Sequence, residues 1–265
     1  MDMEKSEDFP MSADDFRERV VLPGDDVTPL VSFAPAPLRL GLGLFVDGEF
    51  VRASRAGVLS FLEPSRFFVA SSAQRYIPAV GDAVVGVVRA RGAESYSVRV
   101  RGTAAATLPL LAFDGATRRN KPTMAPGACV FARVVAASRH IDAELSCMAP
   151  LGTPRKDWAT GEAIYGELKG GLLVAVPLGL ARRLLDPTCA LLAALGAALS
   201  FQLAVGLNGI VWVAGVGDAE TAAVAGAIQG AAHLDEAQCT ALANDVIAQH
   251  VQRVAEAKAR AKGDD

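Results

Sequence analysis

A long stretch without charged side chains constrains the fold of this chain more than any other feature. Residues 188–217 contain no Asp, Glu, Lys or Arg, and an uncharged run of this length is a candidate membrane helix. Its hydrophobic period changes, however. Leucines recur at helical spacing over residues 191–199, whereas apolar residues alternate with polar or small ones over 201–205. Because a membrane-spanning helix does not tolerate such a break, we expect a buried helix followed by a β-hairpin.

The elements around this run follow the order of a type I KH domain. In chain order, the patterns predict a strand at 171–178, a short helix at 180–185, a helix at 190–199, a hairpin at 201–215 and a helix capped by Asp218 that ends near Leu234. A strand, two helices, two strands and a helix make up this fold, which clamps RNA phosphates with a Gly-x-x-Gly loop between its first two helices.

The segment GLNG, from Gly206 to Gly209, has the spacing of that loop but lies in another place. It separates the two predicted strands of the hairpin, where Asn-Gly is the preferred pair for a tight turn. The position between the two helices, from Leu185 to Thr188, has no glycine and carries Asp186, which would repel a phosphate. We therefore predict that GLNG is a turn and that this KH domain has lost its RNA clamp.

Five alternating segments before the KH domain predict an OB-type barrel. They span residues 82–91, 94–102, 103–111, 128–138 and 143–148. In the second segment, alternation places Tyr96, Val98 and Val100 on one face and Ser97, Arg99 and Arg101 on the other. We expect Tyr96 in the core, so aromatic side chains that could stack on bases are scarce on this barrel.

The net charge of −3 conceals a basic middle third. Residues 1–38 hold three Lys and Arg against nine Asp and Glu, residues 39–139 hold fourteen against six, and residues 140–265 hold nine against fourteen. A basic block of this kind is typical of a surface that meets phosphates, and a solvated face with a chance excess is the alternative.

The loop GATRRNKP, residues 115–122, concentrates this charge. Its cations could follow a phosphate chain without reading base identity, which would give salt-sensitive contacts. The candidate RNA-binding residues are Arg89, Arg99, Arg101, Arg118, Arg119 and Lys121. An acidic partner protein could be bound by the same charges, and the sequence leaves both readings open.

Neither a catalytic constellation nor a metal site is expected. The four cysteines, at 129, 147, 189 and 239, have no ligand spacing and are predicted to be reduced and mostly buried. The three histidines are isolated, and no paired acids or phosphate loop appear. We therefore expect a protein that is not an enzyme and that uses no cofactor. The acidic first 19 residues lack a signal peptide, so an intracellular location is expected.

Five strings resemble one family. They are VLPGD at 21–25, GDAVVGVV at 81–88, FDGATRRNKP at 113–122, LGLARRLL at 178–185 and GLNGIVWV at 206–213. With the order of domains, they resemble the S1/KH cap subunits of the RNA exosome over most of the chain. The alanine-rich composition and the C-terminal extension depart from that family.

The resemblance implies a mainly β protein with an α/β part. Its expected segments are an acidic disordered leader (1–19), an N-terminal β-domain (20–78), an S1-type OB barrel (79–149), a type I KH domain (150–234) and a C-terminal helix with a tail (235–265). The helix is expected to begin with a cap at Asp235 and Gln238 and to dock on the KH domain; a partner-binding helix is the alternative.

The resemblance also implies a function. In such proteins a non-catalytic cap subunit lies on a ring of RNase PH-like proteins and helps to guide single-stranded RNA into a central channel. The turn formed by Gly206, Asn208 and Gly209 would support packing between the S1 and KH domains, and the N-terminal β-domain would contact the ring. Nuclear, nucleolar and cytoplasmic pools are expected. A stand-alone RNA-binding protein, the sister cap subunit and an unrecognised nuclease are the alternatives.

Overall fold

The protein is described by a computed structural model that covers residues 19–32, 37–62, 65–71, 75–101, 105–138, 140–150, 152–153, 156, 158 and 163–263. The chain divides into two compact units, Met1–Ser72 and Ala73–Asp265. The predicted leader, residues 1–19, lies outside the described residues except for Arg19.

The first unit is a small β-domain. Its strands are β1 (Val20–Val21), β2 (Arg39–Leu40), β3 (Leu44–Asp47), β4 (Phe50–Ala53), β5 (Gly57–Leu62) and β6 (Arg66–Ala70), with the short helix α1 (Thr28–Val31). Four strands form a sheet in the order β1-β5-β6-β2, and β3 pairs with β4 as a hairpin. Alternation in β6 buries Phe67 and Val69, and Phe67 lies 4.8 Å from Phe61 between ring centroids. These apolar contacts form the core of the unit.

The second unit begins with a closed five-stranded barrel. Its strands are β7 (Ala83–Arg91), β8 (Ser95–Arg99), β9 (Ala106–Pro109), β10 (Cys129–Ala136) and β11 (Glu144–Ser146). They join in the order β11-β9-β8-β7-β10, and β11 also pairs with β10, which closes the barrel. The only parallel neighbours in this ring are β9 and β11. The predicted OB fold is confirmed.

Tyr96 is fully buried in the barrel, as its alternation with valines predicts. Its hydroxyl donates a hydrogen bond to the carbonyl oxygen of Pro122 at 2.7 Å and accepts one from the backbone nitrogen of Met124 at 3.1 Å. Pro122 and Met124 are also buried. Tyr96 therefore fixes the end of the basic loop to the barrel, because buried backbone groups need partners.

A sixth strand joins the barrel sheet beyond the boundary that the sequence suggests at residue 149. The strand β12 (Gly166–Leu168) pairs antiparallel with β10, and Phe131 lies opposite Gly166. Tyr165, just before β12, packs on Phe131 with the ring centroids 5.0 Å apart. The strand has only three residues, and no turn signal or alternation in so short a segment could reveal it.

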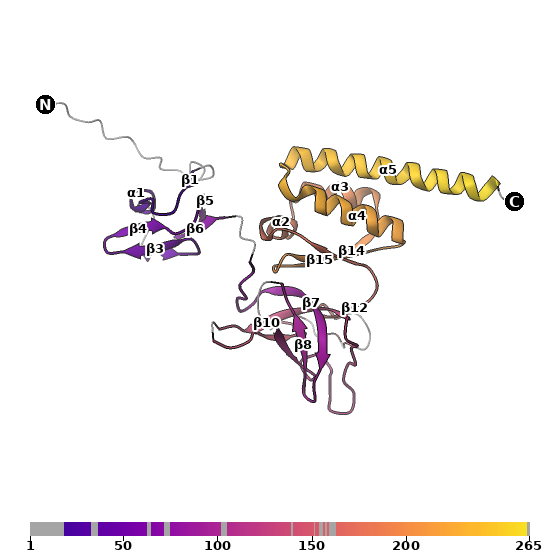
Figure 1. The fold of residues 1–265 in the computed structure, drawn as a ribbon, viewed down its shortest axis with the longest axis horizontal. Coiled ribbons are helices and arrows are strands. Elements are labelled where there is room, and N and C mark those ends of the chain that lie inside the picture. The colour runs from indigo at the N-terminus through magenta and orange to yellow at the C-terminus, as the bar shows by residue number, and fades with distance from the viewer. Residues whose placement is uncertain are drawn as a thin grey trace. The chain divides into compact units, whose positions relative to one another are not determined.

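The KH domain follows with the predicted order of elements. These are β13 (Leu172–Ala175), α2 (Leu178–Leu184), α3 (Ala190–Ala198), β14 (Phe201–Gly206), β15 (Ile210–Gly215) and α4 (Asp218–Gly230). The sheet is antiparallel in the order β13-β15-β14. Figure 1 shows it between the helices and the barrel. The uncharged run forms α3 and the hairpin, and no helix among the described residues has the length and hydropathy to cross a membrane. At the start of α4, Gly217 rather than Asp218 is the capping residue.

The C-terminal extension forms the helix α5 (Glu236–Gly263), preceded by a short 3-10 turn, Ala231–His233. At its start, the backbone nitrogen of Asp235 donates to the side-chain oxygen of Gln238 at 3.2 Å, which is one half of a capping box. Cys239 and Ala243 are buried in the KH core. Helix α5 packs against α3 and α4 (Figure 1), so the extension is part of the KH fold.

Replacing Tyr96 with phenylalanine should lower the free energy of unfolding of the barrel. The Y96F variant keeps the ring but leaves the Pro122 carbonyl and the Met124 amide without their partner, which costs about 1–3 kcal/mol. Urea unfolding measures the change. The matched control is Y165F, whose hydroxyl has no hydrogen bond among the described residues; it should change stability by less than about 0.5 kcal/mol. Equal midpoints for Y96F and the unmodified chain would contradict the role of this hydroxyl.

Candidate nucleic-acid interface

The GLNG turn joins the KH hairpin to the barrel. Gly209 adopts a φ of +73°, which glycine accommodates without strain. Asn208 is fully buried. Its side-chain oxygen accepts from the backbone nitrogen of Val85 at 3.3 Å, and its side-chain nitrogen donates to the Val85 carbonyl oxygen at 2.7 Å. The side-chain amide of Asn208 thus pairs with both the N–H and the carbonyl group of Val85, which is on a strand of the other domain.

The barrel strand β7 has an open edge at this point. Strand β8 pairs with β7 only from Val87 onward, so no strand among the described residues pairs with the backbone of residues 83–85 on that side. The backbone nitrogen of Leu207 donates to the Ala83 carbonyl oxygen at 2.8 Å, and Asn208 serves Val85. The turn therefore continues the hydrogen bonding of the barrel sheet into the KH domain, which satisfies an edge that would otherwise be unpaired.

Close packing surrounds these hydrogen bonds. Val85, Ala204 and Trp212 form a buried apolar cluster between the barrel and the KH sheet. Gly206 lies against β7 so closely that a Cβ atom would be 2.7 Å from the Val85 nitrogen and would also collide with the side chain of Asn208. Only a residue without a side chain fits there.

Arg101 also lies at this junction. Its Nη1 atom donates to the carbonyl oxygens of Val176 and Gly209, the latter at 3.0 Å. The sequence places Arg101 among the candidate RNA contacts, and the structure shows one nitrogen of its guanidinium hydrogen-bonded to the KH domain. Arg101 lies beyond β8, which ends at Arg99, so the predicted alternation does not extend to it.

Two other candidate residues lie on neighbouring strands of the barrel. Arg89 on β7 and Arg99 on β8 are exposed. Arg99 lies opposite Val87, two residues from Arg89, and the pairing of the two strands is irregular between Val88 and Ala90. The β7–β8 ribbon therefore presents two cations to solvent, as a surface that tracks a phosphate chain requires.

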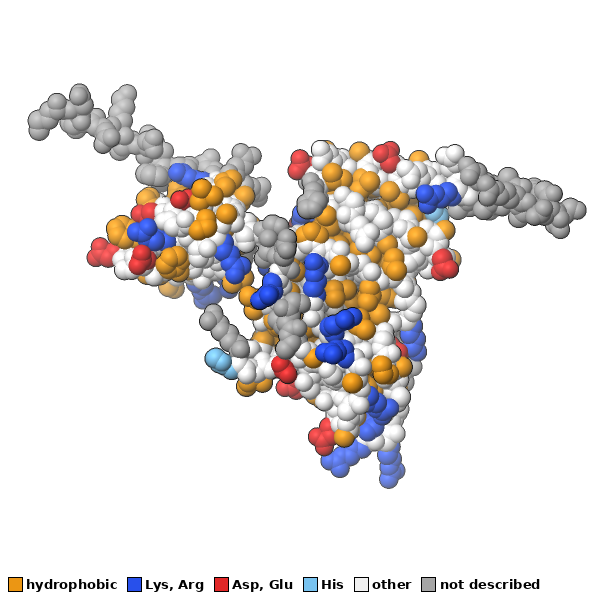
Figure 2. Space-filling view, in the orientation of Figure 1, with side chains coloured by type: hydrophobic (Ala, Val, Ile, Leu, Met, Phe, Trp, Pro, Cys, Tyr) orange, Lys and Arg blue, Asp and Glu red, His pale blue; other side chains and the backbone are white. Residues whose placement is uncertain are grey.

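The basic loop connects β9 to β10. Arg118 and Arg119 are exposed and Lys121 is half-buried. A tight turn holds the tip: the Thr117 nitrogen donates to the Asn120 carbonyl oxygen at 2.8 Å, and the Asn120 nitrogen donates to the Thr117 hydroxyl oxygen at 3.0 Å. Lys and Arg side chains gather at the lower end of the barrel in Figure 2. The loop thus presents its cations on a fixed backbone.

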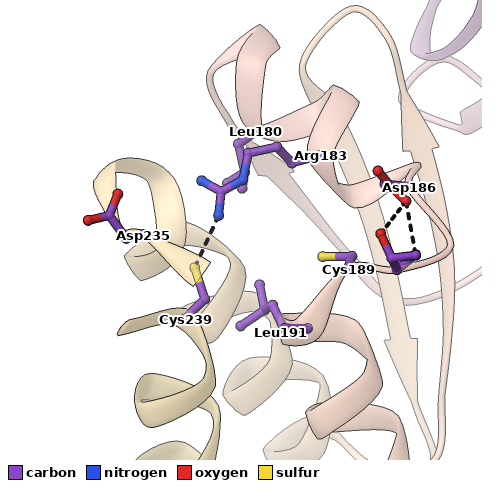
Figure 3. A pocket seen from close by; sticks show the side chains of 9 residues that line it. Leu180, Arg183, Asp186, Cys189, Leu191, Asp235 and Cys239 are labelled. Carbon is purple, nitrogen blue, oxygen red and sulfur yellow. Dashed lines mark hydrogen bonds between the residues drawn. The ribbon is translucent and has the colours of Figure 1, made fainter. Parts of the chain in front are cut away.

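The position of the usual KH clamp is a self-contained turn with negative charge (Figure 3). One carboxylate oxygen of Asp186 accepts from the hydroxyl of Thr188 at 2.7 Å and from its backbone nitrogen at 2.9 Å. These hydrogen bonds, that from the side chain first, hold the pKa of Asp186 below its ordinary value. The carboxylate is therefore ionised at neutral pH, and its charge would repel a phosphate.

A pocket of about 330 Å³ lies beside this turn, and Arg183, which lines it, contacts the start of the C-terminal helix. Arg183 donates to the carbonyl oxygen of Leu234 at 3.0 Å and to the sulfur of Cys239 at 3.5 Å. In Figure 3 its guanidinium is directed toward the start of α5 and away from Asp186. Arg183 thus ties the extension to α2.

The cysteines differ from one another in burial. Cys147 and Cys239 are buried, whereas Cys129 and Cys189 are only half-buried, and none of the four forms a disulfide. Burial is the main cause that raises the pKa of Cys147, with the charge of Asp114 second. Among the described residues, no three His, Cys, Asp or Glu side chains are grouped as metal ligands.

A groove of about 520 Å³ brings together aromatic residues that the sequence analysis missed. Phe113, Trp158, Tyr165 and Trp212 line it. Phe113 lies between the barrel strands β9 and β10, Trp158 and Tyr165 lie between β11 and β12, and Trp212 is on the KH strand β15. Because the four residues are spread over a hundred positions, no local pattern in the sequence could have brought them together.

Comparisons with known proteins agree with the two domains. A family model described as "Exosome complex component RRP40, S1 domain" matches residues 76–167, and a KH domain model matches residues 171–216. A barrel of this order joined to a type I KH domain defines an S1/KH protein, a class built on two nucleic-acid-binding folds.

Relatives narrow the class further. Exosome complex component RRP40 of Drosophila melanogaster is 36% identical over 221 residues, which cover 83% of this chain and 90% of the relative. The protein of the same name from Schizosaccharomyces pombe is 36% identical and covers 72% and 79%, and that from Saccharomyces cerevisiae is 33% identical and covers 73% and 80%. The chain belongs to the RRP40 family of exosome complex components.

Replacing Asn208 with alanine should loosen the junction. The N208A variant leaves the amide and the carbonyl of Val85 buried without partners, so the free energy of unfolding should fall by about 2–4 kcal/mol. Urea unfolding measures this. N120A removes an exposed amide from the basic loop and should change stability by less than about 0.5 kcal/mol. If N208A were as stable as N120A, the Asn208 hydrogen bonds would not hold the domains together.

Replacing Gly206 with alanine tests the close packing separately. The added methyl group would collide with the Val85 backbone and with Asn208, so G206A should lose about 1–3 kcal/mol of stability. The control is G179A in α2, where a Cβ atom meets nothing within 4 Å; this change should raise helix stability slightly. Thermal unfolding of both variants separates the two effects, and a neutral G206A would contradict the packing argument.

Proposed function

We propose that this protein is a non-catalytic cap subunit of the RNA exosome. In this proposal it lies on the ring of RNase PH-like subunits, stabilises that ring and helps to guide single-stranded RNA into the central channel for processing and decay. Nuclear, nucleolar and cytoplasmic pools follow from the same proposal. The observation that carries it is membership of the RRP40 family together with a barrel that presents cations on a fixed framework.

The pattern of charges supports a guiding role. Arg118 and Arg119 project from a loop, and Arg89 and Arg99 from a strand pair. These four cations can attract a phosphate chain, and phosphate contacts position a nucleic acid without reading its sequence. Contacts of this kind are independent of sequence and allow RNA to pass along the surface.

The state of the KH domain supports a subunit rather than an independent RNA binder. Its clamp position carries Asp186 in place of glycines, and its hairpin is used to hold the barrel through Asn208. A KH domain of this kind contributes rigidity and orientation to the barrel. We infer that high affinity for RNA depends on neighbouring subunits, which supply the remaining contacts along the path.

The first unit provides a candidate surface for the ring. Its hairpin β3–β4 exposes Phe45, Val46 and Phe50, and exposed apolar side chains grouped on one hairpin favour protein contact. Beside them Arg52 forms an ion pair with Asp47 at 3.0 Å. We propose that this hairpin contacts a ring subunit.

Removing the charge of the basic loop should weaken RNA retention by the assembled complex. The triple variant R118A/R119A/K121A loses up to three phosphate contacts, so the slope of log affinity against log salt should decrease in magnitude by about two to three. Filter retention of single-stranded RNA over a salt series measures this slope.

The matched control is R182A/R253A, which removes two exposed cations from α2 and α5. This control should leave the salt slope unchanged, because neither residue lies on the barrel. If the triple variant retained RNA as well as the unmodified complex and with the same salt slope, the RNA role of the loop would be contradicted. Tight binding of RNA by the isolated chain would favour a stand-alone binder.

A further inference from the structure

The aromatic groove lies where the barrel, β12 and the KH sheet meet. Phe113 precedes the basic loop, Tyr165 precedes β12, and Trp212 is in the middle of β15. With Trp158 they line a hollow of about 520 Å³, which lies in the range of sites that bind small organic groups. The groove therefore supplies the aromatic surface that the barrel strands lack.

One polar atom in this groove lacks a partner. The indole nitrogen of Trp158 is buried from solvent and makes no hydrogen bond, whereas that of Trp212 donates to the Gly170 carbonyl oxygen at 2.8 Å. Trp158 is held in place, because its backbone nitrogen donates to the Asp114 carbonyl oxygen at 3.1 Å. A buried indole N–H without an acceptor is uncommon and costly. The nitrogen has almost no exposed surface, so an acceptor atom of a ligand would satisfy it after a small shift of the ring.

The groove is continuous with the basic loop. Phe113 and Pro122, which flank the loop on either side, both line the groove. The hydroxyl of Tyr96 donates to the Pro122 carbonyl oxygen at 2.7 Å, which holds the end of the loop next to the groove. A chain whose phosphates meet the exposed Arg118 and Arg119 thus has an aromatic hollow next to its path.

The remaining polar groups of the groove suit the edge of a base. Three exposed polar side chains line the groove: Glu167 in β12, Lys169 directly after β12, and Gln202 on β14. A carboxylate accepts from the exocyclic amino group of a base, and an amide both donates and accepts. Lys169 adds a cation for a neighbouring phosphate.

We propose that this groove holds one unstacked nucleobase of a single-stranded RNA whose phosphates are retained by the basic loop. The base lies against the half-buried ring of Tyr165, and an acceptor atom on its edge receives the indole N–H of Trp158. Stacking of this type is tolerant of sequence, because every base has a flat aromatic face. The proposal rests on the proposed RNA-binding function and adds a base subsite to its phosphate contacts.

The chain offers a direct signal for the test, since its two tryptophans both line the groove. The probes are a single-stranded RNA hexamer and a hexamer of the same ribose-phosphate backbone without bases. Binding of the complete hexamer to the full chain at low salt should quench tryptophan emission. The abasic hexamer should bind at least about fivefold more weakly, which is the lower end for one stacked base, and should leave the emission unchanged.

Two variants sharpen the test. W158F keeps an aromatic ring and removes the indole N–H, and Q202A removes an exposed side chain from the groove without disturbing a core. Each should weaken binding of the complete hexamer and leave binding of the abasic hexamer unaltered. The control R182A, on the surface of α2, should affect neither probe. Unaltered binding of the complete hexamer by both groove variants would overturn the proposal.

The outcomes distinguish this site from the function on which it rests. Equal binding of the two hexamers with unchanged emission overturns the base subsite and leaves the phosphate contacts standing. Absence of binding of either hexamer, both by the chain alone and by the assembled complex, overturns both. In the assembled complex, 4-thiouridine RNA should crosslink to the peptides that contain Trp158 and Tyr165. If a protein–protein crosslinker joined these peptides to another subunit while 4-thiouridine gave no RNA crosslink, the groove would be occupied by protein. That result would also overturn the proposal.

Discussion

The pair of hydrogen bonds between Asn208 and the backbone of Val85 is the interaction on which the second unit depends. A single amide satisfies both groups of a strand edge, and the surrounding Ala204 and Trp212 exclude water. Because both hydrogen bonds are buried, losing either one would leave an amide or a carbonyl group without a partner, which is costly in free energy. The two domains therefore share one junction with one orientation. The junction orients the barrel, with its basic loop and β7–β8 ribbon, relative to the KH domain.

The KH domain shows how one fold element can change its use. Its clamp position has become an anionic turn closed by Asp186 and Thr188, while the glycines of the GLNG turn approach a neighbouring backbone instead of a phosphate. The physical requirement is the same in both cases, since only glycine permits such an approach. In this chain the requirement serves domain packing, and Arg183 adds α5 to the same rigid body.

Local patterns allowed much of the fold to be predicted, and contacts between distant residues account for the rest. Alternation identified Tyr96 as a core residue and the helical period identified α3, because both signals lie within a few positions. Strand β12 was missed since three residues carry no period. The hydrogen bonds of Arg101 were not predicted, because its partners, Val176 and Gly209, are remote in sequence. The aromatic groove depends on four such remote positions.

Affinity purification of the tagged protein from its own cells, with mass spectrometry of the proteins that co-elute, distinguishes a cap subunit from an independent RNA-binding protein. RNase PH-like ring subunits should co-elute in amounts close to that of the tagged chain, because a cap subunit is a stoichiometric part of its assembly. Recovery of the chain alone, with RNA bound to it, would contradict the cap-subunit function. That result would assign the barrel and groove to an independent RNA-binding protein.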